Sequence, residues 1–277
     1  MNNIIFNTGE TSVELKRKYN PEDSLMRNVQ LRLLDMLLYF DKVCKENGIN
    51  YRLDSGMVLG AIRHGGFIPW DDDVDVAIDN YSDYKRLCNY LKKHPHPQYV
   101  LQDDTTDNRH IKHWSTLRDL KSEYIHLEAG DDILDRMLQY RGLQIDIFPF
   151  EKGIIKSIYL EYAKLNNKEK WALLEQRYFK MRLIHFIRKY ICNPILRNVS
   201  RIFGNDMFIM YAYGMPFKYR IIPKDVIFPY SHVTFEGIEL PAPAQPERYC
   251  EIMYGNYMDL PPIEERGSHN VTYRIWD

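Results

Sequence analysis

The stretch that decides the fold reads DSGMVLGAIRHGGFIPWDDDVDVAI and spans residues 54–78. Near its end, four carboxylates fall within five positions: Asp71, Asp72, Asp73 and Asp75. These negative charges repel one another, and a bound divalent cation is the usual compensation. The surrounding apolar residues predict a strand, in which Asp73 and Asp75 point to the same face. A solvated acidic turn is the alternative, which the apolar flanks disfavour.

A further carboxylate, Asp146, lies within the apolar run LQIDIFPF at residues 143–150. A buried carboxylate is unfavourable unless it is paired or bound to metal, although the wet face of an edge strand would also accept one. If this strand lies beside the first, Asp73, Asp75 and Asp146 converge. We predict that they hold two Mg²⁺ ions, with Mn²⁺ as the alternative, which polarise a phosphoryl group. Asp71 or Asp72 could then accept the proton of an attacking hydroxyl.

A glycine turn precedes the acidic segment, at Asp54-Ser55-Gly56. It leads into a predicted short helix, and backbone N–H groups at a helix N-terminus can bind phosphate. We therefore predict phosphate contacts for Ser55 and Gly56, although an ordinary strand-to-helix turn would have the same sequence. Arg63 and His64 follow closely, and both are predicted to bind substrate or phosphate; the alternative for Arg63 is a position on the surface.

Predicted helices and strands elsewhere in the chain indicate an α+β protein. A long helix is expected to begin at Asn20-Pro21 and to end at Asn47-Gly48, and another to run from Asn80 or Ser82 to about Lys93. Strands are predicted at 99–102, 114–118 and 141–149, and a hairpin at 232–240.

Three segments are expected along the chain. Residues 1–150 form the catalytic core with its N-terminal helix, residues 151–222 form a basic region of two or three helices, and residues 223–277 form a loop-rich segment that packs back on the core. The basic region interleaves Lys and Arg with aromatic side chains. Helices with a packed apolar face and a solvated basic face are the favoured interpretation, with peripheral contact to a membrane surface as the alternative.

Composition limits the class of protein. The chain has 277 residues and a formal net charge of -1, so no overall positive field directs it to nucleic acid. The N-terminus lacks a basic region followed by an apolar one, and no stretch is long and apolar enough for a membrane span. The four cysteines are widely separated, which argues against a disulfide framework. We predict a cytoplasmic protein, at most peripheral at the inner face of the membrane.

The segment from Leu53 to Ile78 resembles the signature of the LicD family of phosphotransferases. Its alternating aspartates are also similar to the metal motif of the wider polymerase-beta-like nucleotidyltransferases. This resemblance implies a nucleotidyltransferase-like mixed sheet flanked by helices, in which Gly56 matches the turn, Asp73 and Asp75 the carboxylate pair, and Asp146 the third carboxylate. GLQIDIFPF and the closing run from FEGIELPAP to YGNYMDLPPIEERGSH also resemble the family.

The resemblance extends from about Ile49 to His269 and is weakest in the basic region. It implies an enzyme that moves phosphocholine, or a related phospho-alcohol or phosphonate, from a CDP- or CMP-activated donor such as CDP-choline. The acceptor would be a hydroxyl of a cell-surface glycan or teichoic acid precursor, for example a lipid-linked one. Binding roles are implied for Arg118, Arg266 and His269, although a cross-strand ion pair would equally explain Arg118.

Two other classes of function remain open from the sequence. One is a nucleotidyltransferase that joins a nucleotide to a sugar phosphate through the same carboxylates and releases pyrophosphate. The other is a non-enzymatic module that binds calcium or a glycan through the acidic cluster.

Overall fold

A five-stranded mixed sheet lies at the centre of the computed structural model, which describes residues 4–128, 131–152, 156–203, 207–209 and 221–276. Its strands run in the order β1-β2-β6-β4-β3. They comprise β1 (Arg52–Leu53), β2 (Val74–Ile78), β3 (Tyr99–Gln102), β4 (Ser115–Asp119) and β6 (Gln144–Pro149). β2 and β6 are parallel, whereas the other neighbours are antiparallel. The predicted α+β class, with a mixed sheet flanked by helices, is confirmed.

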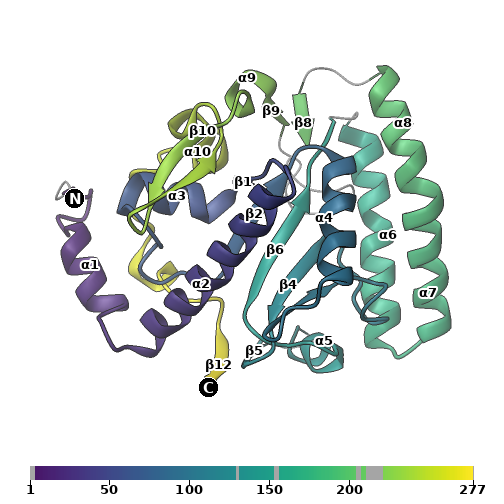
Figure 1. Cartoon of the computed structure of the whole chain (residues 1–277), viewed down its shortest axis with the longest axis horizontal. Helices are drawn as coiled ribbons and strands as arrows, with labels where there is room; N and C mark the ends of the chain where they lie inside the picture. Colours follow the sequence, from purple (N-terminus) through teal and green to yellow (C-terminus); the bar gives the residue numbers. More distant parts are fainter. Residues whose placement is uncertain (1–3, 129–130, 153–155, 204–206, 210–220, 277) are drawn as a thin grey trace.

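Helices α2 (Leu25–Glu46) and α4 (Tyr81–Lys93) cover one face of this sheet (Figure 1). The apolar stripe of α2 is buried at every turn, which is why this helix packs on the core. Its predicted start at Asn20-Pro21 is wrong. Ser24 caps the helix by accepting a hydrogen bond from the Arg27 N–H at 3.1 Å, and Asn20 instead ends a separate helix, α1 (Ser12–Tyr19). The predicted end at Asn47 and the cap of α4 at Asn80 are confirmed.

The signature stretch folds as β1, then α3 (Ser55–His64), then β2. Gly65 ends α3 with φ +68°, a left-handed conformation that glycine adopts without steric cost. A Cβ on Gly60 would lie 2.4 Å from the carbonyl oxygen of Gly66, so the helix can approach the following turn only because position 60 lacks a side chain. This close return directs the chain from α3 into the acidic segment.

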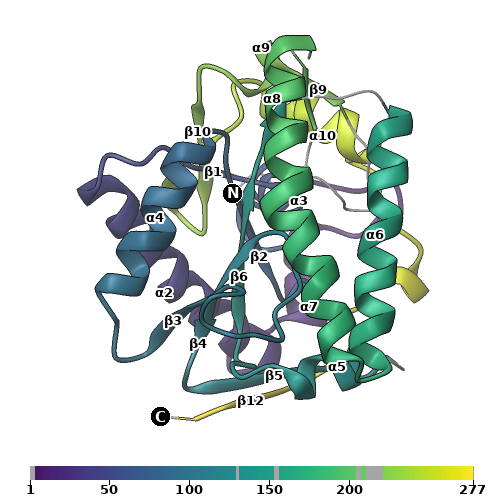
Figure 2. The same ribbon diagram turned by 90° about the vertical axis from the view of Figure 1, so that its right-hand side faces the viewer.

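The predicted basic helices are confirmed within the described residues. They are α6 (Lys156–Leu174), α7 (Tyr178–Phe186) and α8 (Asn193–Phe203), with the π-helical segment η1 (Ile187–Cys192) joining the last two. Together they stand beside the sheet, with α7 and α8 outermost (Figure 2). A small sheet of β7 (Glu151–Lys152), β8 (Met207–Ile209) and β9 (Ile221–Pro223) lies at the far end of this region from α5 (Asp131–Met137). No helix in the described residues is long and apolar enough to cross a membrane.

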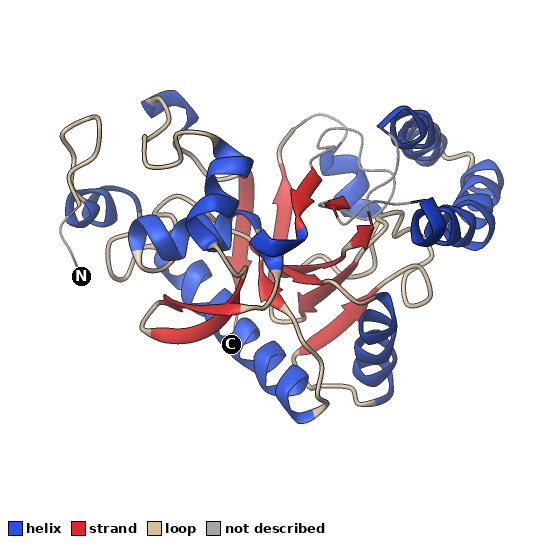
Figure 3. Ribbon diagram, turned by 90° about the horizontal axis from the view of Figure 1, so that it is seen from above, coloured by secondary structure: helices blue, strands red, loops and turns tan. Residues whose placement is uncertain are grey.

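The C-terminal residues return to the core in several short elements (Figure 3). They comprise α9 (Lys224–Ile227), the predicted hairpin β10 (Ser231–Phe235) and β11 (Ile238–Ala242), α10 (Pro246–Tyr254), the 3-10 turn η2 (Ile263–Glu265) and β12 (Val271–Ile275). β12 pairs antiparallel with β5 (Ser122–His126), a contact that the sequence did not predict. This pairing brings the end of the chain to the acidic segment.

Candidate active site

Two of the predicted carboxylates lie side by side on adjacent strands at the centre of the sheet. β2 and β6 are adjacent and parallel, and Asp75 is the register partner of Asp146. On the other side of β6, Asp146 is in register with Thr116 of β4. Because register partners project to the same face of a sheet, Asp75, Asp146 and Thr116 form one polar row through an otherwise apolar core. The predicted proximity of the two strands is therefore confirmed.

Asp73 occupies a different position from the one expected. β2 begins at Val74, so Asp73 immediately precedes the strand and does not lie within it. Its carboxylate nevertheless lies close to the other acidic residues. One potential ligand atom from each of Asp71, Asp73 and His269 lies within 4.8 Å of the other two. Asp71, predicted only as a supporting residue, therefore lies directly beside Asp73 and His269.

Burial and mutual repulsion dominate the electrostatics of this cluster. The pKa of the Asp71 carboxyl is raised well above its usual value, first by burial and then by Asp73. The pKa of Asp75 is likewise raised, by burial and then by Asp73 and Asp146, and that of Asp73 is raised chiefly by burial. A group of carboxylates in this state binds protons or cations to relieve the repulsion. The site is therefore poised to take up positive charge.

Asp146 differs from the other carboxyls of the cluster because its pKa is lowered. Burial acts to raise its pKa, but Lys112 and Thr116 outweigh that effect, so the pKa lies below its usual value. Lys112 Nζ lies 3.2 Å from Asp146 Oδ2, and Thr116 Oγ1 donates to Asp146 Oδ1 at 2.8 Å. Sequence reasoning missed both partners, because their proximity to Asp146 depends on the strand order.

Asp72 faces a different set of groups from its neighbours. It is 1% exposed, and it accepts hydrogen bonds from His269 Nδ1 at 2.6 Å and from the Tyr273 hydroxyl. The hydrogen bond to Asp72 raises the pKa of His269 to about 9, so the imidazole is protonated at neutral pH. Its Nε2 lies 4.0 Å from Asp73 Oδ2, which places a positive charge at the rim of the cluster. The pairing of β12 with β5 thus supplies His269, which the sequence predicted, and Tyr273, which it did not.

The glycine turn contacts the cluster directly. A Cβ on Gly56 would lie 2.8 Å from Asp71 Oδ2, so only glycine allows this carboxylate to approach the start of α3. The Ser55 N–H donates to the Tyr249 hydroxyl at 3.1 Å, and that hydroxyl donates in turn to Asp54 at 2.6 Å. The backbone N–H of Ser55 is therefore used within the protein, whereas Gly56 borders the carboxylates.

Arg63 links the C-terminal segment to α3, and its neighbour His64 accepts a hydrogen bond from it. Arg63 Nη1 donates to the carbonyl oxygens of Tyr257 at 2.9 Å and Asp259 at 3.2 Å, and Nε donates to His64 Nε2 at 2.9 Å. Burial lowers the pKa of His64 to about 3, so this imidazole is neutral. Arg63 thus binds the protein's own backbone and His64 binds Arg63, and the contacts of both residues with phosphate stay predictions.

The other two predicted arginines are also buried among groups of the protein. Arg118 donates to Gln102 Oε1 at 2.8 Å and to the Gly142 carbonyl at 2.9 Å. Arg266 donates to the Pro261 carbonyl at 2.7 Å and forms an ion pair with Glu10 at 2.5 Å. The structure supports no substrate-binding role for either arginine, so those roles also stay predictions.

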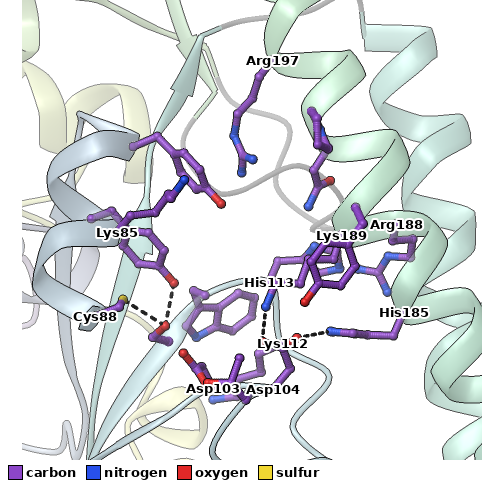
Figure 4. Close-up of a pocket in the computed structure, with 18 of the residues that line it drawn as sticks. Lys85, Cys88, Asp103, Asp104, Lys112, His113, His185, Arg188, Lys189 and Arg197 are labelled. Carbon is purple, nitrogen blue, oxygen red and sulfur yellow. Dashed lines mark hydrogen bonds and ion pairs between the residues drawn. The ribbon is translucent and has the colours of Figure 1, made fainter. Parts of the chain in front are cut away.

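A cavity of about 510 Å³ lies between α4 and the helices α7 and α8 (Figure 4). Lys112 and Trp114 form part of its wall, so the ion pair of Lys112 with Asp146 connects this cavity to the acidic cluster. Lys85 and Arg197 line it as well, and both lie over the ring of Tyr81, with Arg197 Cζ 3.4 Å from the ring centroid. The cavity therefore combines cationic and aromatic side chains next to the carboxylates.

Comparisons with known proteins identify the family of this chain. The sequence model described as the LicD/FKTN/FKRP nucleotidyltransferase domain matches residues 48–195, more than half of the chain. The lipopolysaccharide cholinephosphotransferase LicD of Haemophilus influenzae is 24% identical over 269 residues, which cover 89% of this chain and 96% of that protein. The ribitol 5-phosphate transferase FKRP of Homo sapiens is 50% identical over 40 residues, 14% of this chain and 8% of that protein.

The chain belongs to the LicD/FKTN/FKRP family. It is a LicD-family phosphotransferase, an enzyme whose class of reaction is the transfer of a phospho-group. This assignment overturns the alternative of a non-enzymatic module that binds calcium or a glycan.

Proposed function

We propose that this enzyme transfers phosphocholine, or a related phospho-alcohol or phosphonate, from a CDP- or CMP-activated donor to a glycan hydroxyl. The acceptor is a cell-surface glycan or teichoic acid precursor, and CMP is released. The observation that carries the proposal is the gathering of Asp71, Asp73, Asp75 and Asp146 beside Gly56. Phospho-group transfer needs such a cluster because the reacting group and its leaving group are both anionic.

The residues of the cluster suit a hard divalent cation. Carboxylate oxygens are the ligands that Mg²⁺ prefers, with Mn²⁺ as the alternative. The raised pKa values of Asp71 and Asp75 reflect burial first and then repulsion from neighbouring carboxylates, which a cation would relieve. Asp73, Asp75 and Asp146 would hold the metal, with Asp71 beside them. Bound there, one or two ions would neutralise charge on the donor diphosphate and on the transferred group.

The chain's own residues would then supply orientation and proton transfer. The acceptor hydroxyl attacks the transferred phosphorus, a new P–O bond forms, and the bond to the CMP oxygen breaks. Asp71 is the better base for the hydroxyl proton, because both oxygens of Asp72 already accept hydrogen bonds from His269 and Tyr273. Protonated His269 stands where it can donate to a phosphate oxygen, and Asp72 keeps it charged and oriented.

Choline is the first choice among the transferred alcohols. The cholinephosphotransferase from Haemophilus influenzae aligns with nearly the whole chain, whereas the ribitol 5-phosphate transferase aligns only over a short segment. Ribitol 5-phosphate is therefore the second candidate group. Nucleotide transfer to a sugar phosphate is the second candidate reaction, because the matching family model describes a nucleotidyltransferase domain and this reaction uses the same carboxylates.

The test is a donor screen with CDP-choline, CDP-ethanolamine, CDP-ribitol, CDP-glycerol and a CMP-phosphonate. We expect CMP release that requires Mg²⁺ or Mn²⁺, is fastest with CDP-choline, and is lost in the Asp146→Asn variant. The matched control is Asp225→Asn, since Asp225 is an exposed carboxylate on α9. Release of pyrophosphate from a nucleoside triphosphate and a sugar phosphate, without CMP release from any CDP donor, would refute phospho-alcohol transfer in favour of nucleotide transfer.

A further inference from the structure

The outermost helical run of the molecule exposes a continuous apolar stripe. α7, η1 and α8 follow one another without a break from Tyr178 to Phe203 and stand in front of the rest of the protein in Figure 2. The large apolar side chains exposed along this run are Phe179, Leu183, Phe186, Ile187, Tyr190, Ile191, Ile195, Ile202 and Phe203. Phe179 is 84% exposed and Phe203 is 81% exposed. Isolated exposed apolar residues are ordinary, but a long row of them marks an interaction surface.

The spacing of these residues shows that they share one side of the helix. Phe179, Leu183, Phe186 and Tyr190 recur every three or four positions, whereas Met181 and Arg188 on the opposite side are buried. The π-helical turns of η1 wind more slowly than an α-helix. The side chains of α8 are therefore rotated about the helix axis relative to an uninterrupted α-helix. This rotation brings Ile195 and Ile202 toward the side that α7 exposes. The stripe is therefore a property of the whole run from 178 to 203.

The charges of this run are of one sign. Residues 178–203 contain six Lys and Arg and no Asp or Glu, in a chain whose formal net charge is -1. Lys180 and Arg182 are exposed and lie on either side of the apolar stripe. An apolar face bordered by basic side chains is the pattern of helices that lie flat on anionic lipid, where the apolar side chains enter the headgroup region and the cations meet the phosphates.

The same helices line the cavity beside the acidic cluster. Lys189 and Arg197 line it (Figure 4), as does Asn193. Tyr190 also lines the cavity and is exposed as part of the stripe. A surface that contacted the stripe would therefore stand at the edge of this cavity. That arrangement suits an enzyme whose substrate is presented at an interface.

We propose that the stripe from Phe179 to Phe203 docks the protein peripherally on an anionic phospholipid surface. Within the described residues no helix could span a bilayer, so the contact is interfacial. A second copy of this chain is the less favoured occupant, because a symmetric pair would bring the exposed Lys180 and Arg182 of both copies together with no acidic residue from the run to neutralise them. The docking does not depend on the proposed transfer reaction, so either can fail without the other.

Vesicle co-sedimentation tests this inference with the full chain. We expect binding to vesicles of phosphatidylcholine mixed with phosphatidylglycerol, and much weaker binding to phosphatidylcholine alone or at high ionic strength. The triple variant Phe179→Ser, Phe186→Ser and Ile195→Ser should bind at least about tenfold more weakly, because these side chains supply the apolar contact. The double variant Lys180→Glu and Arg182→Glu should also lose at least about tenfold of the affinity for the anionic vesicles.

Matched controls come from exposed residues elsewhere. Leu25→Ser with Ile263→Ser removes exposed apolar side chains outside the stripe, and Lys42→Glu reverses an exposed charge on α2. These variants should bind vesicles as the wild type does, and circular dichroism checks that every variant is folded. Equal binding by the triple variant and the wild type would overturn the proposal. So would absence of vesicle binding together with a dimer, seen by light scattering, that the triple variant dissociates.

Discussion

Replacement of Asp73 by Asn tests the electrostatic account of the active site most directly. This change removes one negative charge from the cluster and preserves the size of the side chain. We expect Asp73→Asn to raise the stability of the metal-free protein and to weaken its response to Mg²⁺. The substitution should therefore stabilise the metal-free protein and also reduce its activity. The native cluster holds together carboxylates that repel one another unless a cation is bound, and the variant has less of this repulsion.

The magnitude follows from the geometry. Ligand oxygens of Asp71 and Asp73 lie within 4.8 Å of each other. Two unit charges at that separation repel by about 3 kcal/mol at an effective dielectric constant of about 20. The hydrogen bond between the two carboxyls relieves part of this repulsion through a shared proton. We therefore expect a gain of about 1 to 2 kcal/mol in the free energy of unfolding, or about 2 to 6 °C in Tm.

The sign of the pH dependence follows from the raised pKa of Asp73. A carboxyl whose folded-state pKa is raised binds its proton more tightly in the native protein than in the unfolded chain. Its contribution to stability is then lost as pH rises from the unfolded value, 3.8, through the folded one. The advantage of Asp73→Asn over the wild type should therefore be larger at pH 8 than at about pH 5.

Differential scanning fluorimetry with and without Mg²⁺ measures these effects. Wild-type Tm should rise with Mg²⁺, by an amount that corresponds to about 2.7 kcal/mol at a hundredfold excess over the Kd. Asp73→Asn should show a smaller rise and a loss of at least about a hundredfold in CMP release. Glu22→Gln, at a side chain that is 84% exposed, is the control and should change neither. A metal-free variant less stable than the wild type, with an unchanged response to Mg²⁺, would refute the reasoning.

Three further substitutions test other contacts. Gly56→Ala places a Cβ 2.8 Å from the Asp71 carboxylate and should slow CMP release by about a hundredfold, whereas Gly267→Ala, with no atom within 4 Å of the new Cβ, should be silent in the same assay. His269 has a pKa raised to about 9, so its contribution to stability is complete below 6.5 and is lost as pH rises through about 9. Urea unfolding across this range should show a flatter pH dependence for His269→Gln, and an unchanged slope would contradict the assignment. Arg52→Met leaves the buried carboxylate of Asp54 without its ion pair. Chemical denaturation should show a decrease of about 3 to 5 kcal/mol in the free energy of unfolding, and a decrease under about 1 kcal/mol would contradict this expectation.

Local patterns in the sequence were sufficient to predict most of the helices and strands. The alternation around Asp75, the apolar run around Asp146 and the helical stripe of α2 each identify a segment without knowledge of its neighbours. The start of α2 was predicted wrongly because Asn20 and Ser24 are both good capping residues. Asn20 instead ends α1 and its side-chain amide donates to Gln30, whereas the Ser24 hydroxyl accepts from the Arg27 N–H and begins α2.

The sequence could not assign partners to the residues of the site. Thr116 and Lys112 reach Asp146 only because β4 lies next to β6, and the sequence contains no local signal for that strand order. Tyr273 reaches Asp72 only because β12 pairs with β5, far away in the chain. The predicted phosphate contacts of Arg63, by contrast, depended on its charge alone, and the structure gives that charge to backbone carbonyls.

The sequence by itself determined that carboxylates at 71–75 and at 146 lie on apolar segments, because the charge pattern and the period of burial are properties of neighbouring residues. Only the tertiary structure decided which of them meet. The parallel pairing of β2 with β6 brings Asp75 beside Asp146, and the return of the C-terminus adds His269, which pairs with Asp72. The repulsion among residues 71–75 is local, but the part that Asp146 adds and the positive charge of His269 depend on distances that exist only in the folded protein.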